Sequence, residues 1–153
     1  MDDIHVFMKT PSILGFYGES NTGKTTLIVE IIDRLSKEGF NVASVKISDK
    51  EITIDSEGKD TWKHSKAGSQ LVVFSSESET DFLVKQKMQN DEILDFIIHM
   101  GNYDIIIVEG ARDENIPKIR LGDLKERKNT IMKYDNDFEK LINFIKIEIL
   151  GRN

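Results

Sequence analysis

Residues 12–37 read SILGFYGESNTGKTTLIVEIIDRLSK, and this stretch decides the fold. Its first six residues are mostly apolar and stop at Gly18, as a buried strand does. From Lys24 to Lys37, apolar residues recur at three- and four-residue spacing, which predicts an amphipathic helix that ends before Gly39. Residues 41–47 (NVASVKI) predict the next strand. The segment therefore predicts a β-α-β unit, with the right-handed crossover expected of parallel strands.

The segment between the first strand and the helix matches the phosphate-binding pattern G-x-x-x-x-G-K-[ST] in full: Gly18-Glu19-Ser20-Asn21-Thr22-Gly23-Lys24-Thr25. Gly18 is expected to let the backbone leave the strand sharply, and Gly23 to let it approach an oxyanion without a clashing Cβ. Amides of such a loop, with the positive end of the helix, bind phosphate. Lys24 is expected to reach the β- and γ-phosphates and the Thr25 hydroxyl to bind Mg²⁺. The alternative, a glycine-rich turn without a ligand, agrees less well with the motif's place between strand and helix.

The length and composition predict an ordinary globular chain. Its 153 residues favour a single domain, residues 1–153. A net charge of -6 gives no general attraction to nucleic acid or membranes, so a bound anion needs a local site. The absence of cysteine excludes disulfides, thiolate metal sites and cysteine nucleophiles. The acidic start at residues 1–3, and apolar runs far shorter than the ~20 residues that span a bilayer, predict a cytoplasmic protein.

The remaining sequence continues the alternation of strands and helices. We expect a buried strand at residues 71–74, a short one at 81–85, a strand buried on both faces at 104–109, and shorter strands at 118–121 and 130–133. Helices are expected at 91–100 and 136–150, and residues 48–67 predict a long polar loop with one helical turn near Trp62. This pattern predicts an α/β, three-layer P-loop NTPase-like fold with a mostly parallel sheet and helices on both faces.

Carboxylates offer partners for the metal. Glu109 closes the aliphatic strand, and carboxyl ends of parallel strands gather beside the phosphate loop. A carboxylate there can hold Mg²⁺ through water or orient a nucleophile; the alternative is a solvated residue that closes a strand. Asp49, Asp55 and Asp60 lie in the polar loop and are candidates of the same kind, although each alone is more often a surface turn residue.

The base-recognition motif is incomplete. Guanine readers in GTPases usually present Asn-Lys-x-Asp after a strand, and the aspartate accepts hydrogen bonds from N1 and N2 of guanine. Residues 132–135 read MKYD, which keeps Lys133 and Asp135 but lacks the asparagine. We hypothesise that Asp135 reads guanine. A helix N-cap formed by Asp135 or Asn136 is an equal alternative.

Four stretches, residues 18–26, 58–61 leading to 67–68, 107–110 and 117–119, resemble the molybdopterin-guanine dinucleotide biosynthesis protein B (MobB) family. The resemblance implies a GTP- and Mg²⁺-binding protein with weak hydrolysis, often homodimeric. It implies that such a protein assists the enzyme that joins a guanine nucleotide to molybdopterin.

Residue by residue, the resemblance assigns the loop from Gly18 to Thr26 to the phosphates and the metal. It makes Asp60 and Glu109 metal-side carboxylates and places Lys118 on a shared binding face. Lys24 and Glu109 are then the expected catalytic residues. The chain departs from the family at residues 46–49 (KISD), where histidines are usual; its histidines are at positions 5, 64 and 99.

Two other functions remain open from sequence. A small-molecule kinase needs arginines on a mobile lid, and the stretch from Arg120 to Lys128 is basic, although such a run is more often a solvated face. An adaptor that binds nucleotide without hydrolysing it is the other alternative. Some P-loop proteins use a second lysine directly after the first loop glycine; Glu19 stands there, so that mechanism is not supported.

Overall fold

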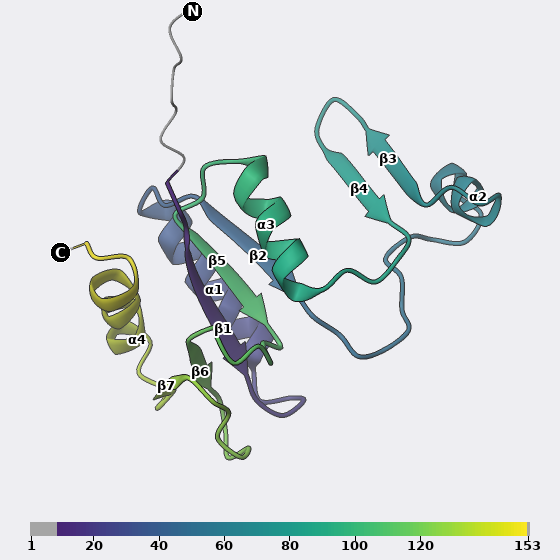
Figure 1. Cartoon of the computed structure of the whole chain (residues 1–153). Coiled ribbons are helices and arrows are strands. Elements are labelled where there is room, and N and C mark those ends of the chain that lie inside the picture. Colours follow the sequence, from purple (N-terminus) through teal and green to yellow (C-terminus); the bar gives the residue numbers. More distant parts are fainter. Residues whose placement is uncertain (1–8, 153) are drawn as a thin grey trace, which may run out of the picture. The chain divides into compact units, whose positions relative to one another are not determined.

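The computed structural model describes residues 9–152, so the acidic start of the chain and His5 lie outside the described residues. The chain forms two compact units (Figure 1). The larger contains the described residues up to Ser48 together with those from Leu94 onward, and the smaller is Asp49–Ile93. A single domain over residues 1–153 stays a prediction. No helix in the described part of the chain has the length and apolar character needed to cross a bilayer.

The larger unit is built on a five-stranded sheet with the order β2-β5-β1-β6-β7. Its strands are β1 (Ser12–Tyr17), β2 (Val42–Lys46), β5 (Ile105–Glu109), β6 (Lys118–Arg120) and β7 (Thr130–Lys133). All neighbouring pairs are parallel, which confirms the predicted sheet. The two central strands, β5 and β1, carry the most continuous apolar runs because both of their faces are buried.

Alternate residues of β5 divide the core into two layers. Ile105 and Ile107 face the cluster that contains α1 (Lys24–Lys37) and α4 (Phe138–Phe144). Ile106 and Val108 pack instead with residues of α3 (Asn90–Met100). Figure 1 shows these helices on opposite sides of the sheet. The three-layer arrangement predicted from the sequence is therefore confirmed.

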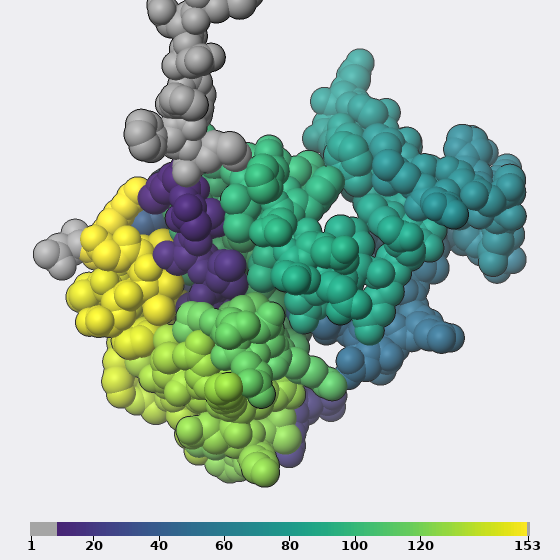
Figure 2. All heavy atoms as spheres, viewed as in Figure 1, coloured from purple at the N-terminus to yellow at the C-terminus, as the bar shows by residue number. Residues whose placement is uncertain are grey.

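The C-terminal helix differs from its prediction of residues 136–150. Regular α-helix runs only through α4, and a π-helical turn, η1 (Ile145–Ile149), follows it. The N-cap is Asp137, whose carboxylate accepts from the Lys140 amide at 3.0 Å. The cap is thus neither Asp135 nor Asn136, because the helix begins at Phe138. Asn136, which precedes the cap, has a left-handed backbone (φ 66°). In the space-filling view this end of the chain (yellow) packs beside β1 (purple), where the Ser12 hydroxyl donates to the Ile149 carbonyl at 2.8 Å (Figure 2).

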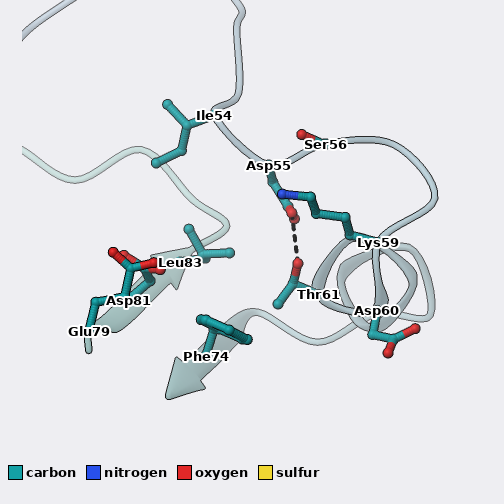
Figure 3. Close-up of a pocket in the computed structure, with 10 residues that line it drawn as sticks. All are labelled: Ile54, Asp55, Ser56, Lys59, Asp60, Thr61, Phe74, Glu79, Asp81 and Leu83. Carbon is teal, nitrogen blue, oxygen red and sulfur yellow. Dashed lines mark hydrogen bonds between the residues drawn. The ribbon is translucent and has the colours of Figure 1, made fainter. Parts of the chain in front are cut away.

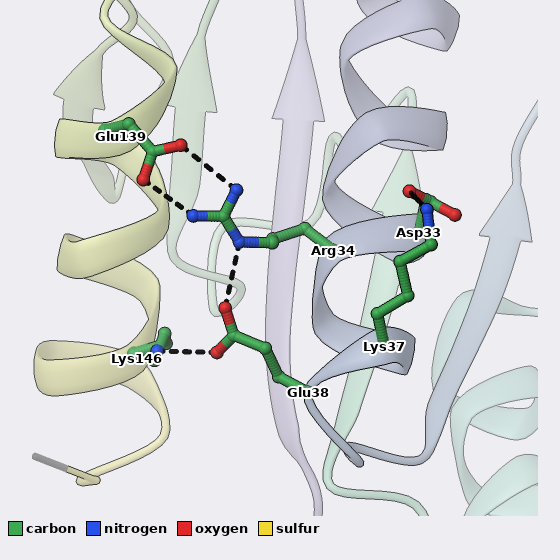
Figure 4. A network of polar contacts seen from close by, with 6 residues as sticks. All are labelled: Asp33, Arg34, Lys37, Glu38, Glu139 and Lys146. Carbon is green, nitrogen blue, oxygen red and sulfur yellow. Dashed lines mark hydrogen bonds and ion pairs between the residues drawn. The ribbon is translucent and has the colours of Figure 1, made fainter.

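A polar network joins α1 to α4 (Figure 4). Arg34 donates to both carboxylate oxygens of Glu139, at 3.0 and 2.7 Å, and through Nε to Glu38 at 2.9 Å. Lys146 adds a 2.5 Å ion pair to Glu38, and its hydrogen bond is the main reason that the pKa of Glu38 is lowered. Because these groups are solvated, the network orients the two helices more than it stabilises them.

The smaller unit contains α2 (Asp60–Lys66) and a hairpin of β3 (Leu71–Ser75) and β4 (Thr80–Val84). The predicted helical turn near Trp62 is thus a helix of seven residues. The expectation that residues 71–74 form a buried strand is wrong about burial, because only Val72 is buried. In the two strands of the hairpin, Val72 is buried and Leu83 half-buried, and the other residues are exposed.

Asp104 anchors the start of β5 and gives a prediction for the pH dependence of stability. Its carboxylate accepts from the Lys9 ammonium at 2.6 Å, the Asn41 amide at 2.8 Å and Arg152 at 3.2 Å. These partners, Lys9 first, lower the pKa of Asp104 below its ordinary 3.8. A carboxylate with a lowered folded-state pKa contributes stability above its unfolded pKa and loses it as pH falls through the folded value.

We expect Asp104→Asn to lower the free energy of unfolding by about 1–2 kcal/mol at pH 7, after allowance for solvent screening. The deficit should shrink as pH falls below 3.8, the ordinary pKa of this carboxyl. Urea unfolding at pH 7, 5 and 3 measures it. Asp33→Asn, at an exposed ion pair with Lys37, is the matched control. A deficit that does not change with pH would contradict this role.

Candidate nucleotide-binding site

The glycine-rich loop leaves β1 and enters α1 in a conformation that needs glycine at two positions for different reasons. A Cβ on Gly18 would lie 2.7 Å from the carbonyl oxygen of Leu121, so close main-chain packing requires glycine there. Gly23 has a left-handed backbone (φ 79°), and nothing lies within 4 Å of the position that its Cβ would take. Open space beside the first turn of a helix suits an oxyanion.

Inside the loop, side chains hold the backbone turn. The Thr22 hydroxyl donates to the Glu19 carbonyl at 2.8 Å. The Lys24 ammonium lies across the loop and donates to the carbonyls of Gly18 at 2.8 Å and Glu19 at 2.6 Å. To reach a β- or γ-phosphate, the Lys24 ammonium must exchange these two weak acceptors for charged ones. That exchange is favourable because hydrogen bonds between ions are stronger.

Thr25 and Glu109, two of the predicted metal ligands, lie together. The Thr25 hydroxyl donates to Oε1 of Glu109 at 2.8 Å. Glu109 ends β5 directly beside β1, in register with Phe16, and its side chain is largely buried, with 14% exposed. A Cβ on Gly110 would lie 2.8 Å from the Ile47 carbonyl, so the glycine after Glu109 keeps the two strand ends close.

Lys46 also belongs to this edge of the sheet, and sequence reasoning gave it no role. It pairs in register with Glu109, and its ammonium lies 3.8 Å from the carboxylate oxygen that Thr25 also contacts. Residues 41–47 and 104–109 were both predicted as strands, but the sequence did not predict that they are neighbours in the sheet. Only the order of the strands shows that β2 neighbours β5.

The donors at this edge fit magnesium better than a metal that needs a full protein cage. In the described residues, no group of three or more histidine, aspartate or glutamate side chains is arranged to hold a metal ion. Mg²⁺ usually binds through one or two protein oxygens, with water and phosphate oxygens completing its shell. Thr25 and Glu109 supply donors of this kind.

The other predicted metal-side carboxylates belong to the smaller unit. Asp60 is on α2, exposed, and pairs with Lys63 at 3.3 Å. The Asp55 side chain is 3% exposed, and its carboxylate accepts from Thr61 and Lys85, both at 2.8 Å. The contact between Thr25 and Glu109 lies within the larger unit and involves neither Asp55 nor Asp60. A metal-binding role for Asp60 stays a prediction.

The two candidate base-recognition residues follow β7 and have local partners. Lys133 pairs with Asp123 at 2.7 Å. Asp135 pairs with Lys140 at 2.5 Å and accepts from the Asp137 amide at 3.2 Å. The hydrogen bond from Lys140 is the main reason that the pKa of Asp135 is lowered, so the carboxylate is charged at neutral pH. Guanine recognition by Asp135 stays a prediction.

Lys118 is not on a binding face, and that expectation is wrong. Its side chain is fully buried, and the ammonium donates to the carbonyls of Ile116 at 2.6 Å and Lys128 at 2.9 Å. Burial lowers its pKa. A central β6 position turned toward the α3 layer, where it packs against Gly15, explains the burial.

The arginines considered for a kinase lid are also engaged with the backbone. Arg127 stacks over the Tyr17 ring at 4.6 Å and donates to the Ala111 carbonyl at 2.7 Å. Arg120 donates to the Leu124 carbonyl at 3.0 Å. These cations fasten residues 111–129 to the sheet, a structural role that leaves the kinase alternative without support. His99 likewise contacts the Asp95 carbonyl at 2.7 Å, as expected of a helix-end histidine.

A parallel sheet of this order, with the loop from Gly18 to Thr25 between β1 and α1, defines the class of P-loop NTPase-like proteins. Within that class, the family model of molybdopterin guanine dinucleotide synthesis protein B (MobB) matches residues 13–146. The chain belongs to the MobB family.

Individual relatives agree with this assignment. A molybdopterin-guanine dinucleotide biosynthesis adapter protein of Haemophilus influenzae is 32% identical over 112 residues, which are 71% of this chain and 62% of that protein. A putative adapter protein of Methanocaldococcus jannaschii is 33% identical over 111 residues, 70% of this chain and 45% of its own length. The match thus spans between about half and two thirds of these curated relatives.

Solved structures show the same fold. Bacillus subtilis MobB superimposes with a TM-score of 0.73 at 17% identity, covering 92% of this chain and 99% of the other. A crystal structure of molybdopterin-guanine biosynthesis protein B gives a TM-score of 0.62 at 26% identity, over 90% and 98% of the two chains.

Proposed function

We propose that this chain is a GTP-binding adaptor of molybdenum cofactor biosynthesis that assists a guanylyltransferase-type partner enzyme in attaching a guanine nucleotide to molybdopterin. The single observation that carries the proposal is the Thr25–Glu109 contact at the end of a complete phosphate-binding loop. The names of the Haemophilus and Methanocaldococcus relatives, both biosynthesis adapter proteins, support the pathway.

In this proposal, main-chain amides of residues 18–26 and the Lys24 ammonium hold the phosphates. Thr25 and Glu109 hold Mg²⁺, directly or through water, and Asp60 is a further candidate ligand. Bound Mg²⁺ supplies positive charge that neutralises charge developing on the phosphates. Lys46 adds an ammonium beside Glu109. Because positioning and charge carry the reaction, with no side-chain nucleophile, we expect slow hydrolysis by the isolated chain.

Nucleotide preference tests this function. We expect Mg²⁺-GTP to bind at least ~10-fold more tightly than Mg²⁺-ATP, because only guanine presents adjacent donors to a carboxylate. Asp135→Asn should shift the preference from GTP toward xanthosine triphosphate, and isothermal titration calorimetry measures both effects. Asp33→Asn, which alters an exposed ion pair on α1, is the control.

The two outcomes are separable. A preference for ATP, or binding of neither nucleotide, would remove the proposed function. An unchanged base preference in Asp135→Asn would remove only the role of Asp135, and leave its carboxylate as the partner of Lys140. Hydrolysis that stays undetectable with and without a partner enzyme would favour the adaptor that binds nucleotide without turnover.

We also propose that the chain forms a homodimer, as the family resemblance implies. The supporting observation is the outward face of the hairpin, where cross-strand neighbours Leu71 and Val84, and Val73 and Phe82, are all between 38% and 52% exposed. An isolated two-stranded sheet is marginally stable, so covering this face stabilises it.

Light scattering should give about twice the chain mass. Val73→Lys should yield monomer and the turn control Glu77→Lys should not; a monomeric wild type contradicts the proposal.

A further inference from the structure

The smaller unit contains a pocket of about 560 Å³ of its own. Residues 54–56 and 59–61 line one side, and Phe74, Glu79, Asp81 and Leu83 of the hairpin region line the other (Figure 3). The volume lies within the ~300–1,000 Å³ typical of small-molecule sites. The pocket includes Lys59-Asp60-Thr61, part of one of the four stretches that carry the family resemblance.

One wall is an aromatic ring with a carboxylate directly beside it. Phe74 and Asp81 are cross-strand neighbours in the hairpin register, so their side chains project from the same face. The Phe74 side chain is on the pocket side and 43% exposed, and Leu83 adds a second apolar group. A flat ring that stacks on Phe74 therefore brings its edge to the Asp81 carboxylate.

The acceptors on this wall are available. Among the contacts of the described residues, neither the Asp81 nor the Glu79 carboxylate takes part in a hydrogen bond or ion pair. Asp55 differs, because its oxygens already accept from Thr61 and Lys85 and its side chain is only 3% exposed. These two hydrogen bonds orient the Asp55 carboxylate, and the one from Lys85 is the main reason that its pKa is lowered.

The opposite side of the pocket offers complementary chemistry. Figure 3 shows Lys59 and Thr61 across from Glu79 and Asp81. Lys59 supplies an ammonium donor and Thr61 a hydroxyl group. The pocket thus has carboxylate acceptors on one side, an aromatic wall, and a cationic donor on the other. A flat ring that presents an amino group and the adjacent ring N–H to the carboxylates, and carries a polar or anionic substituent toward Lys59, matches this arrangement.

We propose that this pocket binds the flat 2-amino-4-oxo ring shared by pterin and guanine, with the ring on Phe74 and its amino edge on Asp81. The inference rests on the proposed function, whose ligands, molybdopterin and a guanine nucleotide, both carry this ring. The carboxylate of Asp81 accepts from the exocyclic amino group and the adjacent ring N–H, as carboxylates accept from paired donors elsewhere. Lys59, on the opposite side of the pocket, is then a donor for a phosphate or hydroxyl substituent of the ring.

The chain contains its own reporter for this site. Trp62 is the sole tryptophan and follows Thr61 in α2, whereas the phosphate loop has no tryptophan. We expect neopterin to change Trp62 fluorescence saturably, with calorimetry as the second measurement. Lumazine, which carries an oxo group where unsubstituted pterin carries the amino group, should bind at least ~10-fold more weakly than pterin, because it would present an acceptor to Asp81.

Variants separate recognition from packing. Asp81→Asn should weaken neopterin binding at least ~10-fold and remove the difference between pterin and lumazine. Phe74→Ala should weaken both ligands, since both stack. Glu77→Gln, in the turn of the same hairpin but outside the pocket, is the matched control and should bind as the wild type does. Asp81 is exposed, so circular dichroism should show that Asp81→Asn folds.

Comparing the affinities for neopterin and guanosine shows whether the bound ring belongs to a pterin or to a nucleotide. Tighter binding of neopterin than guanosine assigns the pocket to a pterin, and the reverse assigns it to the base of a nucleotide. No saturable binding of either, or equal binding by wild type and Asp81→Asn, overturns the proposal. Lys24→Ala should keep neopterin binding. Normal GTP affinity without neopterin binding therefore refutes this pocket alone, and lost GTP binding in the wild type refutes the nucleotide site.

Discussion

Lys24→Ala is expected to weaken the binding of Mg²⁺-GTP roughly 100-fold and to leave the fold intact. The loss is large because the ammonium is the side-chain cation of the phosphate loop, and its removal leaves phosphate charge without a close partner. The fold should survive because, among residues 9–152, the hydrogen bonds of the Lys24 ammonium go to the carbonyls of Gly18 and Glu19 within its own loop. Both carbonyls can be satisfied by water instead.

Calorimetry on wild type and Lys24→Ala, each with GTP and Mg²⁺, measures this effect. Lys37→Ala is a matched control, since Lys37 is a lysine of the same helix that pairs with Asp33 at the exposed surface. Circular dichroism and urea unfolding should show the same fold in all three proteins. Equal GTP affinity in wild type and Lys24→Ala would exclude the loop as the phosphate site.

Glu109→Gln is expected to lower the gain in GTP affinity that Mg²⁺ provides by roughly 10- to 100-fold. The amide oxygen of glutamine can still accept from the Thr25 hydroxyl, so the local hydrogen bond survives. The negative charge that holds the metal or its water is lost. The effect should therefore appear in the presence of Mg²⁺ and be small in EDTA.

Titration of GTP with Mg²⁺ and with EDTA separates these contributions. Glu114→Gln, which alters an exposed ion pair with Lys128, should leave the gain from Mg²⁺ unchanged. An undiminished gain in Glu109→Gln would make Glu109 a residue that only closes its strand, the alternative reading of its position after residues 105–108.

The sequence predicted the larger unit well because its elements obey simple periodicities. The helix Lys24–Lys37 was expected at the residues where it occurs, since one stripe of it meets the core: Leu27, Ile28, Ile31 and Leu35 are buried. Strand β5 was predicted from its continuous aliphatic run, which follows from burial on both faces. Such patterns are local, and tertiary contacts reinforce them.

Predictions failed where burial depends on partners distant in sequence. Residues 71–74 have the apolar run of an interior strand, but β3 pairs only with β4, so one face stays exposed. Lysine is usually a surface residue, yet Lys118 is buried on β6, where two carbonyl groups accept hydrogen bonds from its ammonium. Neither outcome can be read from residue type or spacing.

In the candidate nucleotide-binding site, too, local motifs were predicted and contacts between distant residues were not. The motif predicted the loop and Thr25, and the strand end predicted a place beside the phosphate loop for Glu109, where the structure shows its contact with Thr25. Lys46 required the register of β2 on β5, which no local pattern encodes. The pocket beside Phe74 and Asp81 required the pairing of the hairpin, because these residues are separated in sequence by the turn.

The most direct test of the nucleotide site is a crystal structure with a non-hydrolysable GTP analogue and Mg²⁺. We expect the β-phosphate within the loop of residues 18–25, Lys24 turned from the Gly18 and Glu19 carbonyls to the phosphates, and the metal near Thr25 and Glu109. Triphosphate density elsewhere, with Lys24 still on those two carbonyls, would contradict a phosphate-binding role for this loop.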